Sequence, residues 1–285
     1  TCMLDALLML AQSSSNDGAC GRSVGFVHVP KTGGTTVVEM FRECRQLKAA
    51  VLKSRDVLFH ETAQAQRARH GSGWDEAYTF AVVRNPYDWA VSQFFYTLAV
   101  ACHPGNEAVL LSNPACKYRT ELFHSNGTLR ALSVRHKALF TAWLIEHDEL
   151  ASISGTRFMA PHRLAIEPSL GSANSSSQLA WLSAPMTDGT GTPGTPRLLV
   201  RHVVRLEDSS EYARHATCHG LTGLVRCTHA GSTDGSVPPK PRVTKRSSRA
   251  AASRAYYTPR ACQVVRRRFR VDFAAFGYDA DACLQ

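Results

Sequence analysis

Residues 31–36 combine the residue types that bind a phosphate or sulfate group. The run holds one lysine, two glycines and three threonines: Lys31, Thr32, Gly33, Gly34, Thr35 and Thr36. The lysine supplies a full positive charge, the threonine hydroxyls can donate hydrogen bonds, and the glycines let the backbone approach a ligand closely. The alternative interpretation is a glycine turn with a solvated lysine.

The elements on either side of this loop would place it at a helix N-terminus. Residues 24–29 are apolar and β-branched, which predicts a short buried strand that ends at Pro30. Thr36 and Glu39 have the spacing of a capping box, so a helix is predicted to begin at Thr36 and run to about residue 48. Free N–H groups and the helix dipole favour an anion at such a junction.

Arg84 forms a second candidate anion anchor of the same kind. It follows Tyr78–Val83, a β-prone run that predicts a central strand. Asn85 can cap the next helix, with Pro86 at its first position. An arginine binds phosphate through paired N–H groups, which a lysine cannot do. The alternative is a surface arginine paired with Asp88.

His60 is the candidate general base. It follows Val57–Phe59, a short apolar run that predicts the end of a second strand, and ligands bind at such strand ends in α/β folds. The unperturbed pKa of histidine lies near neutrality, which suits proton removal from a hydroxyl. The alternative is a capping or packing histidine, and the neighbouring Glu61 is the second candidate for the base.

Two segments resemble a known family. The run HVPKTGGTT at 28–36 resembles the 5′-phosphosulfate loop of the Golgi-type carbohydrate sulfotransferases, including the heparan sulfate O-sulfotransferases, whose donor is 3′-phosphoadenosine 5′-phosphosulfate (PAPS). The run FAVVRNPYDWAVSQFF at 80–95 is similar to the second signature of this family. The resemblance implies that Arg84 and Ser92 hold the 3′-phosphate of the donor. The sequence HETAQ at His60 resembles the segment that carries the catalytic histidine.

The resemblance extends over most of residues 24–279 and implies a fold and a reaction. The fold would be α/β, with a P-loop-kinase-like parallel sheet flanked by helices. The enzyme would move a sulfuryl group from PAPS to a hydroxyl, with Lys31 neutralising the leaving group and His60 deprotonating the acceptor. The family needs no metal. The acceptor would be a glycan or another hydroxyl-bearing molecule, with anionic acceptors among the candidates, and no nucleic acid partner is expected.

The chain is organised as one sulfotransferase-like domain at 24–285 after an N-terminal segment or linker at 1–23. The polar stretch 101–128 is assigned to acceptor contact by analogy with the family. Residues 228–255 are basic and rich in Gly, Pro and Ser, which predicts a mobile loop. By the same analogy this loop would close over the donor through Lys245, Arg246 and Ser247, or its charge would attract an anionic glycan.

Cysteine content and sequons indicate the secretory pathway. The chain has nine cysteines, and Cys102–Cys116 and Cys218–Cys227 are close enough in sequence to pair in an oxidising lumen. Asn126 and Asn174 begin glycosylation sequons. We therefore expect a glycoprotein of the Golgi lumen, anchored as a type II membrane protein through a segment not seen in this chain.

Two alternative functions share parts of this evidence. A nucleotide kinase or NTPase would also use an anion loop, but in the Walker A pattern the lysine follows the last glycine, whereas Lys31 precedes both. A non-enzymatic polyanion-binding protein would explain the net charge of +10 and the basic loop. It would leave the loop at 31–36 without a role.

Overall fold

The computed structural model describes about half of the chain and divides it into two compact units. The described residues are 23–35, 37–38, 61–96, 98, 116, 118–124, 130–154, 177–184, 196–208 and 253–283. The first unit comprises 1–83 and 181–243, and the second comprises 84–180 and 244–285. The described chain mixes helices with a small parallel sheet, in agreement with the predicted α/β class. The assignment of one domain to 24–285 stays a prediction.

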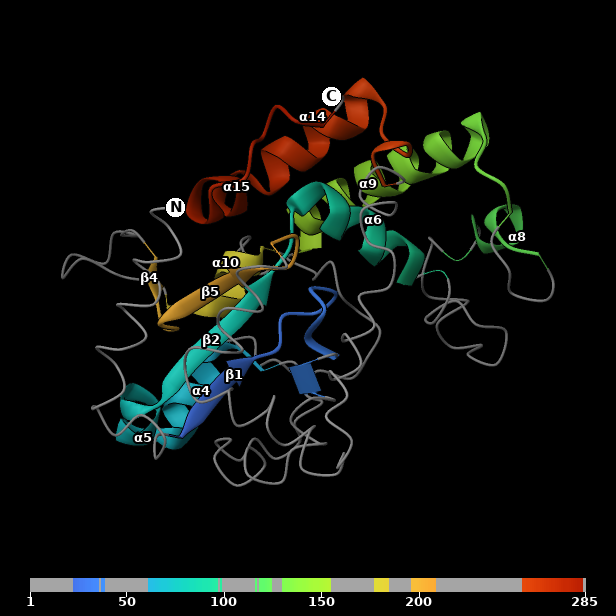
Figure 1. The fold of residues 1–285 in the computed structure, drawn as a ribbon. Helices are drawn as coiled ribbons and strands as arrows, with labels where there is room; N and C mark the ends of the chain where they lie inside the picture. Colours follow the sequence, from blue (N-terminus) through green and yellow to red (C-terminus); the bar gives the residue numbers. More distant parts are fainter. Residues whose placement is uncertain are drawn as a thin grey trace, which may run out of the picture. The chain divides into compact units, whose positions relative to one another are not determined.

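The first unit is built on a parallel sheet of three strands in the order β1-β2-β5 (Figure 1). These strands are β1 (Val24–Val27), β2 (Tyr78–Val83) and β5 (His202–Arg205). Phe26 pairs with Phe80, and Phe80 pairs with His202. The four residues of β1 and five of the six residues of β2 are buried, as expected for parallel strands covered on both faces. The prediction that Tyr78–Val83 is a central strand is confirmed.

Two short helices precede β2 in the described part of the chain. Helix α4 (Ala63–His70) begins after Thr62, whose hydroxyl accepts a hydrogen bond from the Ala65 N–H at 3.2 Å. Helix α5 (Ser72–Glu76) follows Gly71, which has a φ of 55°. The side-chain amide of Gln66 donates to the Phe26 carbonyl at 3.1 Å, which ties α4 to β1.

Two predicted strands differ from the observed ones. The β-prone run LLVRHVVRL at 198–206 predicts one strand, but the chain changes partner within it. Strand β4 (Arg197–Leu198) pairs with β3 (Ser183–Ala184), after which the Arg201 N–H bonds to the Thr79 carbonyl and β5 joins the main sheet. The first strand ends at Val27 instead of Val29. The sequence also predicts a helix that opens at Glu207 and Asp208; Glu207 lies in a turn, and the residues after Asp208 lie outside the described residues.

The second unit is helical and contains a large aromatic core. Its helices are α6 (Pro86–Tyr96), α8 (Arg119–Leu122), α9 (Val134–Ser154), the first residues of α10 (Gln178–Leu182), α14 (Pro259–Arg268) and α15 (Arg270–Phe276). Phe94 packs against Phe140 and Trp143 with ring centroids 5.3 and 5.2 Å apart. The apolar spacing in this segment predicts a buried stripe of Val91, Phe94, Phe95 and Leu98; Phe95 is partly buried and the other three are buried. The sequence also predicts a helix over 131–150, but α9 begins at Val134, and Leu132 precedes it and is exposed.

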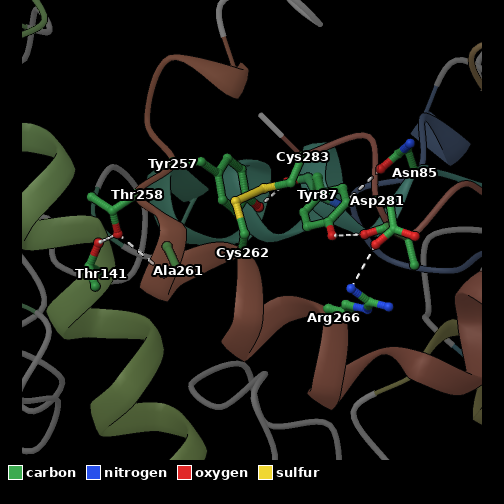
Figure 2. The surroundings of a disulfide bond; sticks show 11 residues. Asn85, Tyr87, Thr141, Tyr257, Thr258, Ala261, Cys262, Arg266, Asp281 and Cys283 are labelled. Carbon is green, nitrogen blue, oxygen red and sulfur yellow. Dashed lines mark hydrogen bonds and ion pairs between the residues drawn. A yellow bond between two sulfur atoms is a disulfide. The ribbon is translucent and has the colours of Figure 1, made fainter. Parts of the chain in front are cut away.

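A disulfide holds the C-terminal segment of the second unit to α14 (Figure 2). It joins Cys262 to Cys283, which are 21 positions apart. The Tyr87 hydroxyl donates to the Ala280 carbonyl at 2.5 Å, and the Arg266 guanidinium pairs with Asp281 at 2.6 Å. These contacts fix the turn that follows α15.

Several predicted features lie outside the described residues. They are the strand at 57–59, Cys102, Cys218, Cys227, both sequons and the loop residues Lys245, Arg246 and Ser247. Cys116 is disulfide-bonded, and its pairing with Cys102 stays a prediction. Among the helices that the structure describes, none has the length and apolarity that a membrane span needs.

Candidate functional site

The candidate anion loop connects β1 to a helical turn in the first unit. Lys31 has a φ of 65° and Gly33 a φ of 88°, so the chain adopts the left-handed region twice within three residues. A left-handed φ is uncommon for a residue other than glycine and is concentrated at functional sites. Alternating left- and right-handed residues aim successive N–H groups into one concavity, which is the geometry of backbone anion sites.

Thr32 stabilises the bend from inside the loop. It is fully buried, and its hydroxyl donates to the Val29 carbonyl at 2.8 Å. Its side chain therefore closes the turn. Thr35 is exposed, so its hydroxyl is available to an incoming anion.

Gly34 is required by its contact with His28. A Cβ atom at Gly34 would lie 2.0 Å from Cδ2 and 2.5 Å from Nε2 of the His28 ring. The His28 side chain is buried and stacks on Phe26 with ring centroids 5.9 Å apart. The ring thus packs directly on the backbone of the loop, and only glycine fits there.

The helix after the loop begins earlier than the capping box predicts. Gly34 and Thr35 are already helical, as are Val37 and Val38, whereas the sequence places the N-cap at Thr36. The reason is the tight turn closed by Thr32, which brings the chain into the helix immediately after Gly33. Thr36 itself lies outside the described residues.

Arg84 is held through its backbone by a buried glutamine in the second unit. The Arg84 N–H donates to Gln178 Oε1 at 2.8 Å, and Gln178 Nε2 donates to the Arg84 carbonyl at 2.7 Å. Gln178 is fully buried. One side-chain amide therefore satisfies both backbone groups of Arg84, and the guanidinium projects from a fixed point.

Asp272 in turn holds Gln178. Its carboxylate oxygens accept the Gln178 N–H at 3.0 Å and the Leu179 N–H at 2.8 Å. Burial raises the pKa of Asp272 to about 7, although the two backbone N–H groups favour the ionised form. Asp272, Gln178 and Arg84 form a continuous chain of hydrogen bonds, which we call the Arg84 clamp.

Helix α6 starts directly after Arg84, as predicted. The Tyr87 N–H donates to Asn85 Oδ1 at 3.0 Å, and Pro86 is the first residue of the helix. Asp88 is buried and accepts a hydrogen bond from the Ser253 hydroxyl, so it supports the helix start from within the unit. Ser92 lies in the second turn of α6 and is partly buried.

The predicted site residues thus fall into two groups, each described within its own unit. Lys31 and Thr32–Thr35 share one loop of the first unit, and Arg84 and Ser92 flank the first turns of α6 in the second. His60 lies outside the described residues, and its role stays a prediction. Glu61, the second candidate base, is engaged by Arg69 in an ion pair.

The structure adds three residues that the sequence did not assign to the site. They are Gln178, Asp272 and His28, the last of which stands at the start of the loop motif at 28–36. A buried glutamine or aspartate has no local sequence signal, because its partners are distant in the chain. For His28 the sequence offers one cue to its position at the loop. It directly follows the predicted strand core and precedes Gly34 by six positions.

Comparison of the chain with models of protein families, with curated proteins and with solved structures finds no match.

Proposed function

We propose that this protein is a PAPS-dependent O-sulfotransferase that sulfates a hydroxyl group of a glycan. The single observation that carries the proposal is that Lys31 and Arg84 each follow, along the chain, one strand of the same parallel pair. Val27 of β1 pairs with Ala81 of β2, so both strands deliver the chain to the same edge of the sheet. Lys31 follows β1 by four residues, and Arg84 is the residue directly after β2.

The donor has the charge distribution that these anchors can bind. PAPS carries a phosphosulfate at the 5′ position and a phosphate at the 3′ position. In the proposal the N–H groups of residues 33–36 and the hydroxyls of Thr35 and Thr36 bind the 5′-phosphate. Arg84 and Ser92 bind the 3′-phosphate. Lys31 contacts the oxygen that bridges sulfur and phosphorus.

The proposed reaction is an in-line transfer. The acceptor hydroxyl oxygen forms a bond to sulfur, the bond between sulfur and the bridging oxygen breaks, and the hydroxyl proton passes to His60. The leaving oxygen gains negative charge, which Lys31 neutralises. The products are a sulfate ester and 3′-phosphoadenosine 5′-phosphate. As in phosphoryl transfer, most of the acceleration would come from positioning and charge stabilisation.

The proposed compartment is the Golgi lumen. The Cys262–Cys283 disulfide supports an oxidising environment. The type II anchor and the glycosylation at the two sequons belong to the same proposal.

The test of this reaction is release of 3′-phosphoadenosine 5′-phosphate from PAPS in the presence of glycan acceptors, without added metal. We expect Lys31→Ala and His60→Ala each to lower kcat/KM by about 100-fold or more, in the range for lost electrostatic or acid–base catalysis. A matched control is Lys137→Ala, a lysine on α9 outside the proposed site. Turnover that requires Mg²⁺ and consumes ATP instead of PAPS would replace the proposal with a kinase.

A further inference from the structure

A hollow of about 530 Å³ lies on the surface of the second unit, beside α14 and α15. Its lining includes three arginines, two aromatic residues and one alanine: Arg266, Arg267, Arg270, Phe273, Tyr278 and Ala280. We call it the arginine hollow. We propose that it binds a sulfate- or carboxylate-bearing sugar of an anionic glycan chain, in addition to the donor anchors.

The wall of the arginine hollow is held in place before any ligand arrives. Gly277 caps α15 with a φ of 64° and turns the chain back, and the Tyr278 N–H bonds to the Phe273 carbonyl at 3.0 Å. The Tyr87 hydroxyl holds the Ala280 carbonyl, and the Cys262–Cys283 disulfide closes the segment (Figure 2). A preformed site avoids the ordering cost that weakens binding to flexible segments.

The charge of the arginine hollow is positive. The guanidinium groups of Arg266, Arg267 and Arg270 are exposed, and none of the lining residues is acidic. Arg266 pairs with Asp281 at 2.6 Å, but both side chains are more than half exposed, so the pair is weak and an incoming anion can compete for the guanidinium. Guanidinium groups bind sulfate and carboxylate through two parallel hydrogen bonds.

The shape of the arginine hollow favours a sugar over a nucleobase. Its volume is within the range of small-ligand sites, roughly 300–1,000 Å³. Single-stranded nucleic acids bind by stacking bases on exposed aromatic faces. Phe273 is only 4% exposed and Tyr278 partly buried, so neither offers an open stacking platform. The exposed arginines and the apolar lining residues instead match a ring with anionic substituents.

The inference that the ligand is a glycan rests on the proposed function, whereas the inference that the arginine hollow binds anions does not. A second contact on a glycan acceptor would raise the effective concentration of the acceptor near the donor anchors. The site would favour chains that already carry sulfate or carboxylate groups.

The test is calorimetric titration with a heparin-derived octasaccharide against three forms of the full chain. They are the wild type, the hollow variant Arg267→Ala/Arg270→Ala and the control Arg197→Ala/Arg260→Ala. The two variants lose equal charge, and the control arginines are exposed and do not line the hollow. We expect the hollow variant to bind the octasaccharide at least ten-fold more weakly and the control less than two-fold more weakly. Unchanged unfolding midpoints would show that both variants remain folded.

Three outcomes would overturn the proposal. They are equal weakening in both variants, absence of octasaccharide binding to the folded wild type, and equally tight binding of an oligothymidylate of matched charge. Titration with 3′-phosphoadenosine 5′-phosphate on the same samples separates this proposal from the proposed function. Loss of octasaccharide affinity in the hollow variant, without nucleotide binding to any form, would retain the hollow and reject the sulfotransferase.

Discussion

Replacing Gly34 with alanine is expected to disrupt the anion loop and abolish donor binding. The new Cβ atom would meet the His28 ring at 2.0 Å, well inside the contact distance of any real pair of carbon atoms. His28 is buried, so its ring cannot swing out without breaking its own packing. We expect a loss of roughly 2–4 kcal/mol in the free energy of unfolding, at or above the usual cost of overpacking.

Two further variants make this prediction specific. Gly73→Ala in α5 is the matched control, because a Cβ atom there meets nothing within 4 Å. It should leave unfolding and donor binding near the wild-type values. In a His28→Ala background Gly34→Ala should cost much less, because the clashing ring is gone. Denaturant unfolding of the wild type, Gly34→Ala, His28→Ala and the double variant measures the coupling energy between the two positions. Equal costs of Gly34→Ala in both backgrounds would show that His28 does not shape the loop.

Replacing Gln178 is expected to release Arg84 and destabilise the second unit. Gln178→Ala would leave the Arg84 N–H and carbonyl without their side-chain partner and open a cavity at a fully buried position. We expect a cost of roughly 3 kcal/mol in the free energy of unfolding, from lost buried hydrogen bonds and packing. Donor affinity should fall by about ten-fold at a temperature where the variant is folded, because Arg84 would no longer project from a fixed point.

Gln178→Met separates the hydrogen bonds from the packing. Methionine fills a similar volume but can neither donate to nor accept from the Arg84 backbone in the way an amide does. It should therefore recover part of the stability of Gln178→Ala but little of the donor affinity. The exposed Gln263 provides a control alanine variant. Full donor affinity in Gln178→Met would mean that the Arg84 clamp does not position the anchor.

The sequence predicts the local elements of this protein well. The strand at Tyr78–Val83, the Asn85–Pro86 helix start and the helix after Thr62 all have strong local signals, namely a β-prone run and capping residues. The α/β class is implied by the resemblance, and the described helices and parallel strands agree with it. The choice of Lys31 and Arg84 as anion anchors follows from residue type and position, whereas Ser92 and the assignment to the 3′-phosphate follow from the resemblance. All of these roles stay predictions.

The features that the sequence does not predict depend on distant partners. The run at 198–206 is broken because Leu199 bonds to Leu182 and Arg201 to Thr79, and no local pattern encodes those contacts. The helix after the anion loop begins at Gly34 because Thr32 closes the turn before it. The Arg84 clamp joins Arg84 to Gln178 and Gln178 to Asp272, and each pair is 94 positions apart, so no local sequence pattern predicts it.

The most direct measurement of the central claim is calorimetric titration of 3′-phosphoadenosine 5′-phosphate into the wild type and Arg84→Ala, in metal-free buffer. Arg260→Ala, which removes an exposed arginine in the first turn of α14, is the control for charge. We expect the wild type and the control to bind the nucleotide and Arg84→Ala to bind at least 100-fold more weakly, since one guanidinium would hold the 3′-phosphate. Absence of binding to the folded wild type, or equal binding by Arg84→Ala, would contradict the proposed donor site.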